Sequence, residues 1–335
     1  MPCYHPLDAW YGRELTSSGK RSIVFNHHKS DSRSIAPDLK LPCGQCIGCR
    51  LERSRQWAMR CVHEATLYDS NCFITLTYND LYLPSDFSLH HGDFQRFMKR
   101  LRKKYGKGIR FYMAGEYGSL CRNCGANKIK CSCGEWEEMP GRPHFHACLF
   151  NHDFDDKTLW KITKSGSRLY TSESLDKLWS DPKTGESMGY TSIGDVTFES
   201  AAYVARYVLK KRGGEGSLDH YTYIDPETGE VHERTPEYNQ PSRRPGIGKL
   251  WLDKYMDDVY PEDFVVMNGV KMKPPKYYDK QFEIMDPLEM ERIKFDREKN
   301  AEKHLDNNTP ERLAVREEVQ VAKLKKLPRN LSTKG

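Results

Sequence analysis

The centre of the chain carries two strand-like stretches with a helix-like stretch between them. Residues 73–78 are mostly β-branched or aromatic and end at an Asn-Asp turn signal, so we expect a core strand there. Residues 94–105 place apolar side chains at i, i+3, i+4 and i+7, which predicts a helix capped by Asp93 and ended by a glycine. Residues 110–118 predict a second strand. This order is typical of a sheet with a helix packed on it.

A third strand-like stretch, residues 143–150, carries two histidines. Because successive side chains of a strand point to opposite faces, His144 and His146 share a face and can bind one cation. Glu116 ends the preceding strand, and antiparallel pairing of the two strands would bring its carboxylate beside the histidines. Two imidazoles and a carboxylate suit Mn²⁺ or, less well, Mg²⁺, and Zn²⁺ also fits. The alternatives are a surface carboxylate and two histidines placed by chance on a half-exposed strand.

Residues 200–212 predict a helix that starts at Ser200 and ends at a Gly-Gly pair. One face of this helix carries two tyrosines and two cations at spacings of three and four: Tyr203, Arg206, Tyr207 and Lys210. Tyrosines at this spacing usually pack in a core. The cations on the same face favour chemistry instead, because they stabilise tyrosinate and the negative charge of an attacked phosphate.

The cysteine pattern indicates metal sites. Eleven cysteines in a chain that shows no export signal favour thiols and metal ligands over disulfides. Four of them share a short polar stretch, which predicts a structural zinc loop formed by Cys121, Cys124, Cys131 and Cys133. A second zinc knuckle is predicted from Cys43, Cys46 and Cys49, with the fourth ligand taken from Cys3, His5 or Cys61 and assigned here to Cys3. The alternative for this second group is a cysteine-rich turn with free thiols.

The remaining stretches complete an α+β prediction, a central antiparallel sheet with flanking helices and cysteine-rich zinc attachments. In chain order they are a polar arm at 1–42, a basic helix at 51–68, a loop or weak hairpin at 215–240, a short helix around Trp251 and Tyr255, a hairpin at 263–272 with Asn-Gly at its turn, and a charged helix or partly disordered tail from 287. The predicted parts are an arm with the basic helix (1–70), a core (71–215) with the cysteine-rich loop at 118–141, an extension packed on the core (216–284) and a tail (285–335).

Composition changes this picture little. Apolar residues make up 37% and charged residues 30% of the 335 residues, and the mean hydropathy of −0.79 describes a polar chain with a small core for its length. The formal net charge of +6 is compatible with nucleic acid but decides nothing alone. Neither a leader-like N-terminus nor an apolar run of membrane length is present, so we expect no membrane partner and a cytoplasmic location. The absence of a GxxxxGK phosphate loop argues against a fused helicase.

Four of these motifs occur in the order in which a known family has them: 73–78, 115–118, 143–146 and 203–210. Together they resemble the HUH endonuclease superfamily of rolling-circle replication initiators. In particular they resemble the replication initiation proteins of gokushoviruses, which are small single-stranded DNA phages of the Microviridae. The stretches at 42–46 and 243–248 also resemble that family, so the likeness covers residues 1 to about 280.

The resemblance implies roles for the residues singled out above. His144 and His146 match the paired metal ligands of the family, and Glu116 matches the acidic residue that completes the set. Tyr203 and Tyr207 match the two nucleophilic tyrosines. Lys210 matches the lysine of the YxxK motif counted from Tyr207, whereas Arg206 occupies that place relative to Tyr203, which leaves the order of the two tyrosines open. The implied fold is RRM-like or ferredoxin-like.

The implied activity is metal-assisted nicking and joining of single-stranded DNA at a replication origin. A tyrosine would form a 5′-phosphotyrosine and release a 3′-hydroxyl primer, with Mn²⁺ or Mg²⁺ as the catalytic ion and the host replication machinery as a further partner. Two alternatives stay open. One is a non-catalytic zinc-dependent protein that binds nucleic acid, in which the tyrosines only pack, and the other is a plasmid relaxase or transposase of the same superfamily.

Overall fold

The computed structural model describes residues 3–17, 19–127, 130–133, 138–163, 166–206, 216–225 and 228–326. The chain forms two compact units, one made of residues 54–290 and the other of residues 1–53 with 291–327. Each unit is described by itself. Among the described residues, no helix combines the length and the apolar content that a membrane span requires.

The unit of residues 54–290 is built on a seven-stranded sheet in which all neighbouring strands are antiparallel. Its strands, in spatial order, are β12 (Tyr238–Pro241), β5 (Arg110–Cys121), β6 (Glu138–Phe150), β4 (Asn71–Thr77), β9 (Thr191–Gly194), β8 (Arg168–Thr171) and β7 (Thr158–Ile162). The α+β prediction of a central antiparallel sheet with flanking helices is therefore confirmed.

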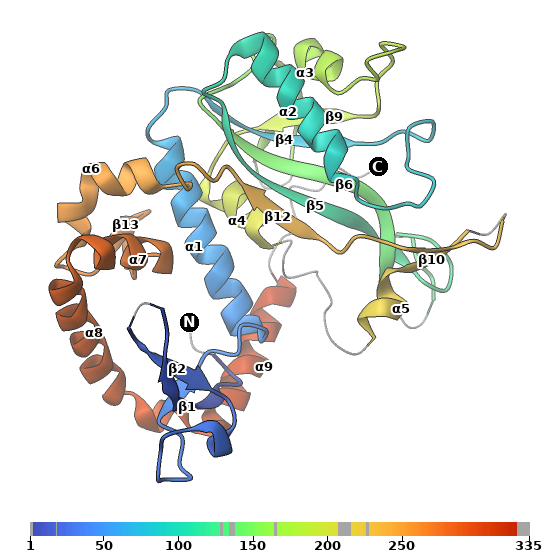
Figure 1. Ribbon diagram of the computed structural model, residues 1–335. Helices are drawn as coiled ribbons and strands as arrows, with labels where there is room; N and C mark the ends of the chain where they lie inside the picture. The colour runs from blue at the N-terminus through green and yellow to red at the C-terminus, as the bar shows by residue number, and fades with distance from the viewer. Residues whose placement is uncertain are drawn as a thin grey trace. The chain divides into compact units, whose positions relative to one another are not determined.

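One face of this sheet packs against α2 (His91–Tyr105), the helix predicted from the period of its apolar residues. Phe94 of α2 lies against Phe145 of β6 and Phe111 of β5, with ring centroids 5.9 and 5.3 Å apart. Figure 1 shows α2 lying across β4, β5 and β6. The predicted order of strand, helix, strand, cysteine loop and strand is the order observed.

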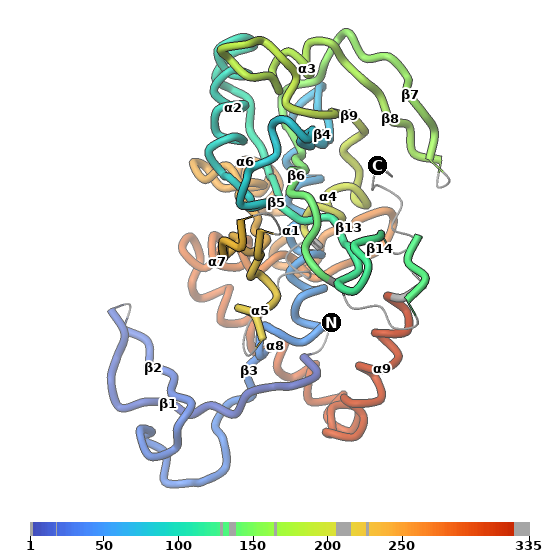
Figure 2. Tube along the Cα trace, turned by 90° about the vertical axis from the view of Figure 1, so that its right-hand side faces the viewer, coloured from blue at the N-terminus to red at the C-terminus, as the bar shows by residue number. Residues whose placement is uncertain are grey.

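The opposite face of the sheet packs against α4 (Phe198–Arg206) and the part of α1 (Ile47–Ala65) that begins at Ser54. Two side chains hold α4 in place. Ser54 donates a hydrogen bond to the Ala202 carbonyl (3.2 Å), and the Asn239 amide donates one to the Val204 carbonyl (2.9 Å). Figure 2 shows α2 and α4 on opposite sides of strands β4 to β6.

Two predicted helix starts are wrong. Asp93 does not cap α2, because the helix begins two residues earlier and His90 occupies the N-cap position; the Asp93 carboxylate is buried and accepts a hydrogen bond from the Tyr78 hydroxyl (2.6 Å). Ser200 does not start α4, because the Thr197 hydroxyl accepts the Ser200 N–H (3.1 Å) one turn earlier. Asp93 instead binds a residue outside its helix, whereas Ser200 exchanges hydrogen bonds with Thr197 at the start of α4.

The rest of this unit surrounds the sheet with short elements. They are α3 (Glu173–Leu178), α5 (Ser217–Tyr221), the hairpin β10 (Thr222–Ile224) and β11 (Val231–Glu233), α6 (Lys249–Val259), the hairpin β13 (Val265–Met267) and β14 (Val270–Met272), α7 (Lys276–Met285) and the start of α8 (Pro287–Glu302). The Asn-Gly turn is confirmed, with positive φ at Asn268 (50°) and Gly269 (76°). Strand β12 is an addition, since the sequence predicts only a loop or weak hairpin there.

The second unit contains a small sheet instead of the predicted polar arm. Its strands are β2 (Arg21–Val24), β1 (Leu7–Leu15) and β3 (Leu39–Leu41), in that spatial order, and a short 3₁₀ turn η1 (His27–Lys29) follows β2. The predicted charged tail is helical in α8 and in α9 (Pro310–Lys326), which are joined by η3 (Leu305–Asn308). Leu313 of α9 is buried against Tyr4 and Cys46. Polar composition hid the small sheet, because few apolar contacts hold it, whereas the helical alternative predicted for the tail is the one observed.

Candidate functional site

The β5–β6 hairpin brings Glu116 and the two histidines together. Glu116 is directly opposite His144 in the strand register. One carboxylate oxygen, Oε1 of Glu116, lies 2.6 Å from Nε2 of His144 and 3.1 Å from Nε2 of His146. The alternation that places the two histidines on one face is confirmed, and the predicted convergence of these three residues is observed.

Hydrogen bonds on the far side of each ring orient the histidines. Nδ1 of His144 lies 3.2 Å from the Arg142 carbonyl, which can only accept, so Nδ1 donates there and Nε2 is the nitrogen that faces Glu116. Nδ1 of His146 lies 2.9 Å from the hydroxyl of Thr75, its neighbour on β4. Both Nε2 atoms therefore point at the carboxylate, held by a second layer of partners that metal-binding histidines typically have.

This donor set fits a divalent cation. Glu116 is 3% and His146 is 1% exposed, so the carboxylate sits in a layer from which water is largely excluded. Burying a negative charge is costly unless a cation or hydrogen bonds compensate it. The ligand atoms of Glu116, His144 and His146 all lie within 4.8 Å of one another, as a shared ion would require. Mixed nitrogen and oxygen donors suit Mn²⁺, Mg²⁺ or Zn²⁺.

Tyr203, on α4, lies beside this group. Its ring centroid is 5.4 Å from that of His146, at an angle of 76° between the rings, and Phe73 of β4 packs against both rings. The hydrogen bonds from Ser54 and Asn239 to the α4 backbone fix this approach. Tyr207 and Lys210 lie outside the described residues, and so does the side chain of Arg206.

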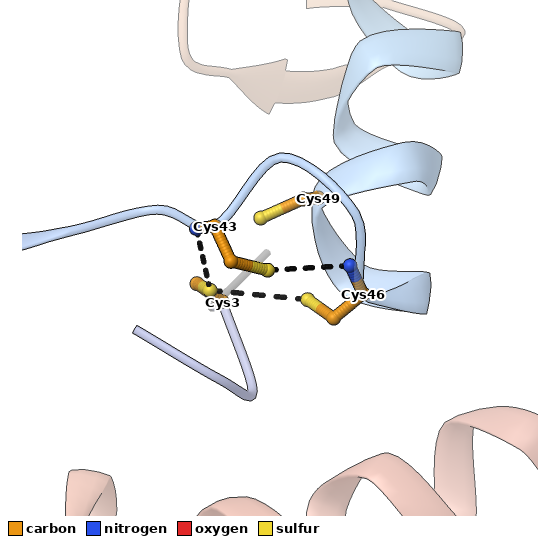
Figure 3. Close-up of side chains that lie close together, drawn as sticks. All are labelled: Cys3, Cys43, Cys46 and Cys49. Carbon is orange, nitrogen blue, oxygen red and sulfur yellow. Dashed lines mark hydrogen bonds between the residues drawn. The ribbon is translucent and has the colours of Figure 1, made fainter. Parts of the chain in front are cut away.

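Four thiols form a second group, in the unit of residues 1–53 and 291–327. Cys43, Cys46 and Cys49 are joined by Cys3, and the four sulfur atoms lie within 4.8 Å of one another. Figure 3 shows the sulfur atoms turned toward a common centre, with Sγ of Cys46 3.8 Å from Sγ of Cys3. Of the other two candidates for the fourth position, His5 contacts Glu317 (Nε2 to Oε2, 2.6 Å) and Cys61 is buried in an apolar cluster that includes Phe73.

The thiols of this group differ in pKa. Burial raises the pKa of Cys46, but hydrogen bonds from the backbone N–H groups of Cys49 and Tyr4 outweigh burial and bring its pKa down to about 6. Burial and the neighbouring thiols raise the pKa of Cys49 to about 12. Several thiolates side by side repel one another, and a divalent cation removes that repulsion.

A third group lies where β5 runs into the loop before β6. Its members are Cys121, Cys124, Cys131 and Cys133, whose sulfur atoms also lie within 4.8 Å of one another. Backbone N–H groups of Cys124 and Asn123 outweigh desolvation and bring the pKa of Cys121 down to about 7, whereas hydrogen bonding with Cys124 and Cys131 raises that of Cys133 to about 12. The predicted four-cysteine loop is thus brought together in space. Both cysteine groups could bind metal.

Two residues of the site were not predicted from the sequence. Thr75 is read there only as a β-branched strand residue, although its position two residues from Phe73 on the same face was a usable signal. Asn239 lies in β12, a polar strand without hydrophobic alternation, so nothing in its sequence indicates a contact with α4.

Comparison with known proteins gives a consistent result. The model of a family described as replication-associated protein ORF2/G2P matches residues 71–126, which include Glu116. The chain is 33% identical over 287 residues to replication-associated protein VP4 of Bdellovibrio phage phiMH2K, and this alignment covers 83% of the chain and 76% of that protein. It is 30% identical over 330 residues to replication-associated protein ORF2 of Spiroplasma virus 4, covering 91% and 88% of the two chains.

A further relative is more distant. Replication-associated protein ORF4 of Chlamydia phage 1 is 26% identical over 275 residues, which cover 77% of this chain and 56% of that protein. No solved structure matches the chain.

Proposed function

We propose that this chain, which belongs to the family of phage replication-associated proteins, starts rolling-circle replication by nicking single-stranded DNA at the origin. One observation carries the proposal. The Tyr203 ring lies 5.4 Å from the His146 ring, so a potential nucleophile and a potential metal-ligand set share one buried corner of the sheet. Tyrosines that only packed in a core would not need a carboxylate and two histidines beside them.

The proposed reaction is a transesterification. The Tyr203 hydroxyl gives up its proton as its oxygen attacks the phosphorus of the scissile phosphodiester in line. The bond from phosphorus to the 3′ oxygen breaks, and that oxygen takes up a proton in turn to leave as a free 3′-hydroxyl. The 5′ phosphate stays on the tyrosine. Because one phosphodiester replaces another, no nucleotide cofactor is needed, and the 3′-hydroxyl can prime a host polymerase.

Further residues would support this step. Glu116, His144 and His146 would hold Mn²⁺ or Mg²⁺, which when bound neutralises negative charge on the scissile phosphate. Tyr207 would supply the second nucleophile, which cuts the regenerated origin. Its spacing from Arg206 and Lys210 in the sequence is that of residues near one another on a helix. The freed 3′ end then attacks the first linkage and closes a circle. We assign this activity to the host cytoplasm, with host replication proteins as partners.

The test is a search for the covalent intermediate. Overlapping labelled single-stranded oligonucleotides that tile the phage genome are incubated with the protein and Mn²⁺ or Mg²⁺, and adducts are separated on denaturing gels. We expect one oligonucleotide to give an adduct that chelation of the metal abolishes. Tyr203→Phe is expected to remove or shift this adduct, and the double variant Tyr203→Phe, Tyr207→Phe to eliminate it.

A matched control is available in Tyr190, which is 83% exposed and lies outside α4. Tyr190→Phe makes the same chemical change and is expected to leave the adduct intact. An adduct that persists in the double variant contradicts the tyrosine assignment. If no oligonucleotide gives an adduct with any divalent metal, the protein is instead a non-catalytic protein that binds nucleic acid.

We also assign Zn²⁺ to the two cysteine groups, because four converging thiols are the donor set of structural zinc sites. Elemental analysis of the purified protein is expected to give two zinc ions per chain. Cys46→Ser and Cys124→Ser are each expected to remove one of them. Cys72→Ala serves as the control, since Cys72 is buried in the core and belongs to neither group. Retention of both ions in either serine variant would contradict the assignment.

A further inference from the structure

A basic cleft of about 850 Å³ lies between α2 and the strand β12, within the unit of residues 54–290. Its walls come from α2, the turn into β5 and the segment that follows β12. Six cationic side chains line it: Lys99, Arg102, Lys107, Arg110, Arg243 and Arg244. None of the residues that line it is acidic. The cleft therefore concentrates positive charge in a concave surface, where it attracts anions more strongly than on a flat one.

Five of these six cations have no carboxylate partner. The side chains of Lys99, Lys107, Arg243 and Arg244 make no hydrogen bond or ion pair within the part of the chain that the structure describes. Arg102 donates only to the Ile109 carbonyl, at 2.8 and 3.1 Å. Burial and the like charge of Arg110 lower the pKa of Arg102. Like charges gathered without counter-charges are costly to hold together, and an anionic ligand removes that cost.

The exception, Arg110, helps to build the cleft. Its guanidinium pairs with the buried carboxylate of Glu64 and donates to the Pro245 carbonyl (2.7 Å). Further hydrogen bonds fix the same segment, and they run from Ser242 N–H to the Phe111 carbonyl (2.8 Å), from Arg60 to the Ile247 carbonyl (2.9 Å) and from Gly248 N–H to Glu64 (2.7 Å). The backbone beside Arg243 and Arg244 is thus fixed before any ligand arrives, which reduces the entropy lost on binding.

The floor of the cleft is apolar. Phe111 of β5, which is half-buried, lines it together with Phe94 and Met98 of α2, which are almost fully buried. Proteins that bind single-stranded nucleic acid combine cations that follow the phosphates with aromatic or apolar surface that contacts the bases. In this cleft the ring of Phe111 provides the aromatic surface and the six cations provide the charge.

The cleft lies away from Glu116 and the histidines. Phe94 and Phe111 belong to the α2 side of the sheet, whereas Glu116 and His146 face α4. A strand bound in the cleft would therefore occupy a different position from the phosphate that Tyr203 attacks.

We propose that this cleft binds the phosphate backbone of single-stranded DNA at a second position, separate from the nicking site. The choice of DNA as the anion rests on the proposed function. The charge and shape of the cleft support the binding of an anion at this position. Two bound positions on one strand would hold the origin on the protein while the nicked ends are exchanged.

The test compares two variants that lose the same charge. Lys99→Gln, Arg243→Gln, Arg244→Gln removes three cations of the cleft, and Lys103→Gln, Lys104→Gln, Lys254→Gln removes three exposed cations outside it. Binding of a single-stranded oligonucleotide of about 30 nucleotides is measured by fluorescence anisotropy at several salt concentrations. If each contact contributes about 0.7 to the slope of log K against log salt, the cleft variant is expected to lose roughly 2 from that slope. The control variant is expected to keep it.

A second measurement uses the unaltered protein, so it does not depend on the folding of a variant. Acylation of Lys99 and Lys107 by an N-hydroxysuccinimide ester is followed by mass spectrometry, with Lys103 as the internal reference. DNA is expected to protect Lys99 and Lys107 relative to Lys103. Equal protection of all three, or protection by a nucleoside triphosphate but not by the oligonucleotide, would overturn the proposal.

These results separate the cleft from the nicking reaction. A wild-type protein that forms no tyrosine adduct but shows the protection pattern would refute the proposed function and keep the cleft. A protein that nicks DNA while the two triple variants bind it with equal slopes would refute the cleft and keep the proposed function.

Discussion

The two faces of the seven-stranded sheet are buried alike but differ in chemistry. Toward α2, the central strands present apolar side chains such as Met113 and Phe145. Toward α4, the same strands present Phe73 but also Glu116 and His146, which are no more exposed. Burial alone therefore does not tell what a strand residue contributes. A buried polar residue needs a hydrogen-bonding or charged partner, and the identity of that partner indicates what the residue does.

Two buried carboxylates of this unit show the difference. Glu64 pairs with the guanidinium of Arg110, which is always charged, and accepts the Gly248 N–H, so its charge is compensated within the fold. Glu116 faces two imidazoles, which carry positive charge only when protonated. The first arrangement holds a loop in place. The second sets a carboxylate against groups whose charge depends on protonation, a donor set that could hold a divalent cation.

Breaking the polar face should give the largest effect. Glu116→Gln keeps the size of the side chain but removes its charge, so it is expected to weaken Mn²⁺ binding and to lower the nicking rate by about a thousandfold or more, because a catalytic metal supplies several kcal/mol. Calorimetric titration with Mn²⁺ and the rate of adduct formation measure the two effects. Glu173→Gln, at an exposed carboxylate paired with Lys177, is the matched control. Wild-type metal affinity in Glu116→Gln would show that the carboxylate is structural.

Breaking the apolar face should act on stability instead. Phe94 is 1% exposed and contacts Phe111 and Phe145, so Phe94→Ala is expected to lower the free energy of unfolding by about 3 kcal/mol or more. Chemical denaturation followed by circular dichroism measures this change. At a temperature where the variant is folded, its Mn²⁺ affinity should match that of the wild type. A large loss of affinity would mean that the two faces are not independent.

The sequence predicts the polar face well because local rules determine it. The period of two places His144 and His146 together, and a hairpin between neighbouring strands brings Glu116 opposite them, so no long-range information is needed. The cysteine groups are predicted for the same reason, since their spacing is local except for Cys3. The choice of Cys3 depends on where the N-terminal segment lies in the fold, and cysteine spacing does not give that position.

The failures share a cause. Strand β12 is polar and gains its place by pairing with β5, and the three-stranded sheet at 7–41 is held by pairing with little buried apolar area. Asp93 has the sequence features of a helix cap, but its carboxylate accepts a hydrogen bond from the hydroxyl of Tyr78, which directly follows β4. Tertiary contacts decide each of these, and a one-dimensional pattern does not record them.

Another buried histidine, His63, sharpens the comparison, because no carboxylate of the described residues hydrogen-bonds its ring nitrogens. His63 of α1 stacks on Trp251 with 3.5 Å between ring centroids and lies 2.9 Å from the Tyr278 hydroxyl, and burial lowers its pKa to about 3. In the unfolded chain this histidine has a pKa near 6.5. Its contribution to the free energy of unfolding is therefore complete above pH 6.5 and is lost as the pH falls toward 3. At pH 5 the loss is about 2 kcal/mol.

Urea unfolding at pH 7.5 and pH 5 measures this effect. His63→Gln keeps a polar group near Tyr278 but cannot take up a proton, so the wild type should lose about 2 kcal/mol more than the variant between the two pH values. Equal losses would mean that His63 is protonated in the folded protein, and the contrast with His146 would disappear.

The smallest predicted effect concerns Thr75, the residue behind the candidate metal ligand His146. Thr75→Val keeps the shape of a β-branched side chain and removes the hydroxyl that lies 2.9 Å from Nδ1 of His146. Without this partner the ring is free to change tautomer and orientation, so Mn²⁺ affinity is expected to fall by about tenfold, at the lower end of what such supporting contacts contribute. Thr158→Val, at an exposed position on β7 of the same sheet, is the matched control. Because Val fills the same space, an unchanged affinity would show that packing against Phe73, rather than hydrogen bonding, holds His146 in place.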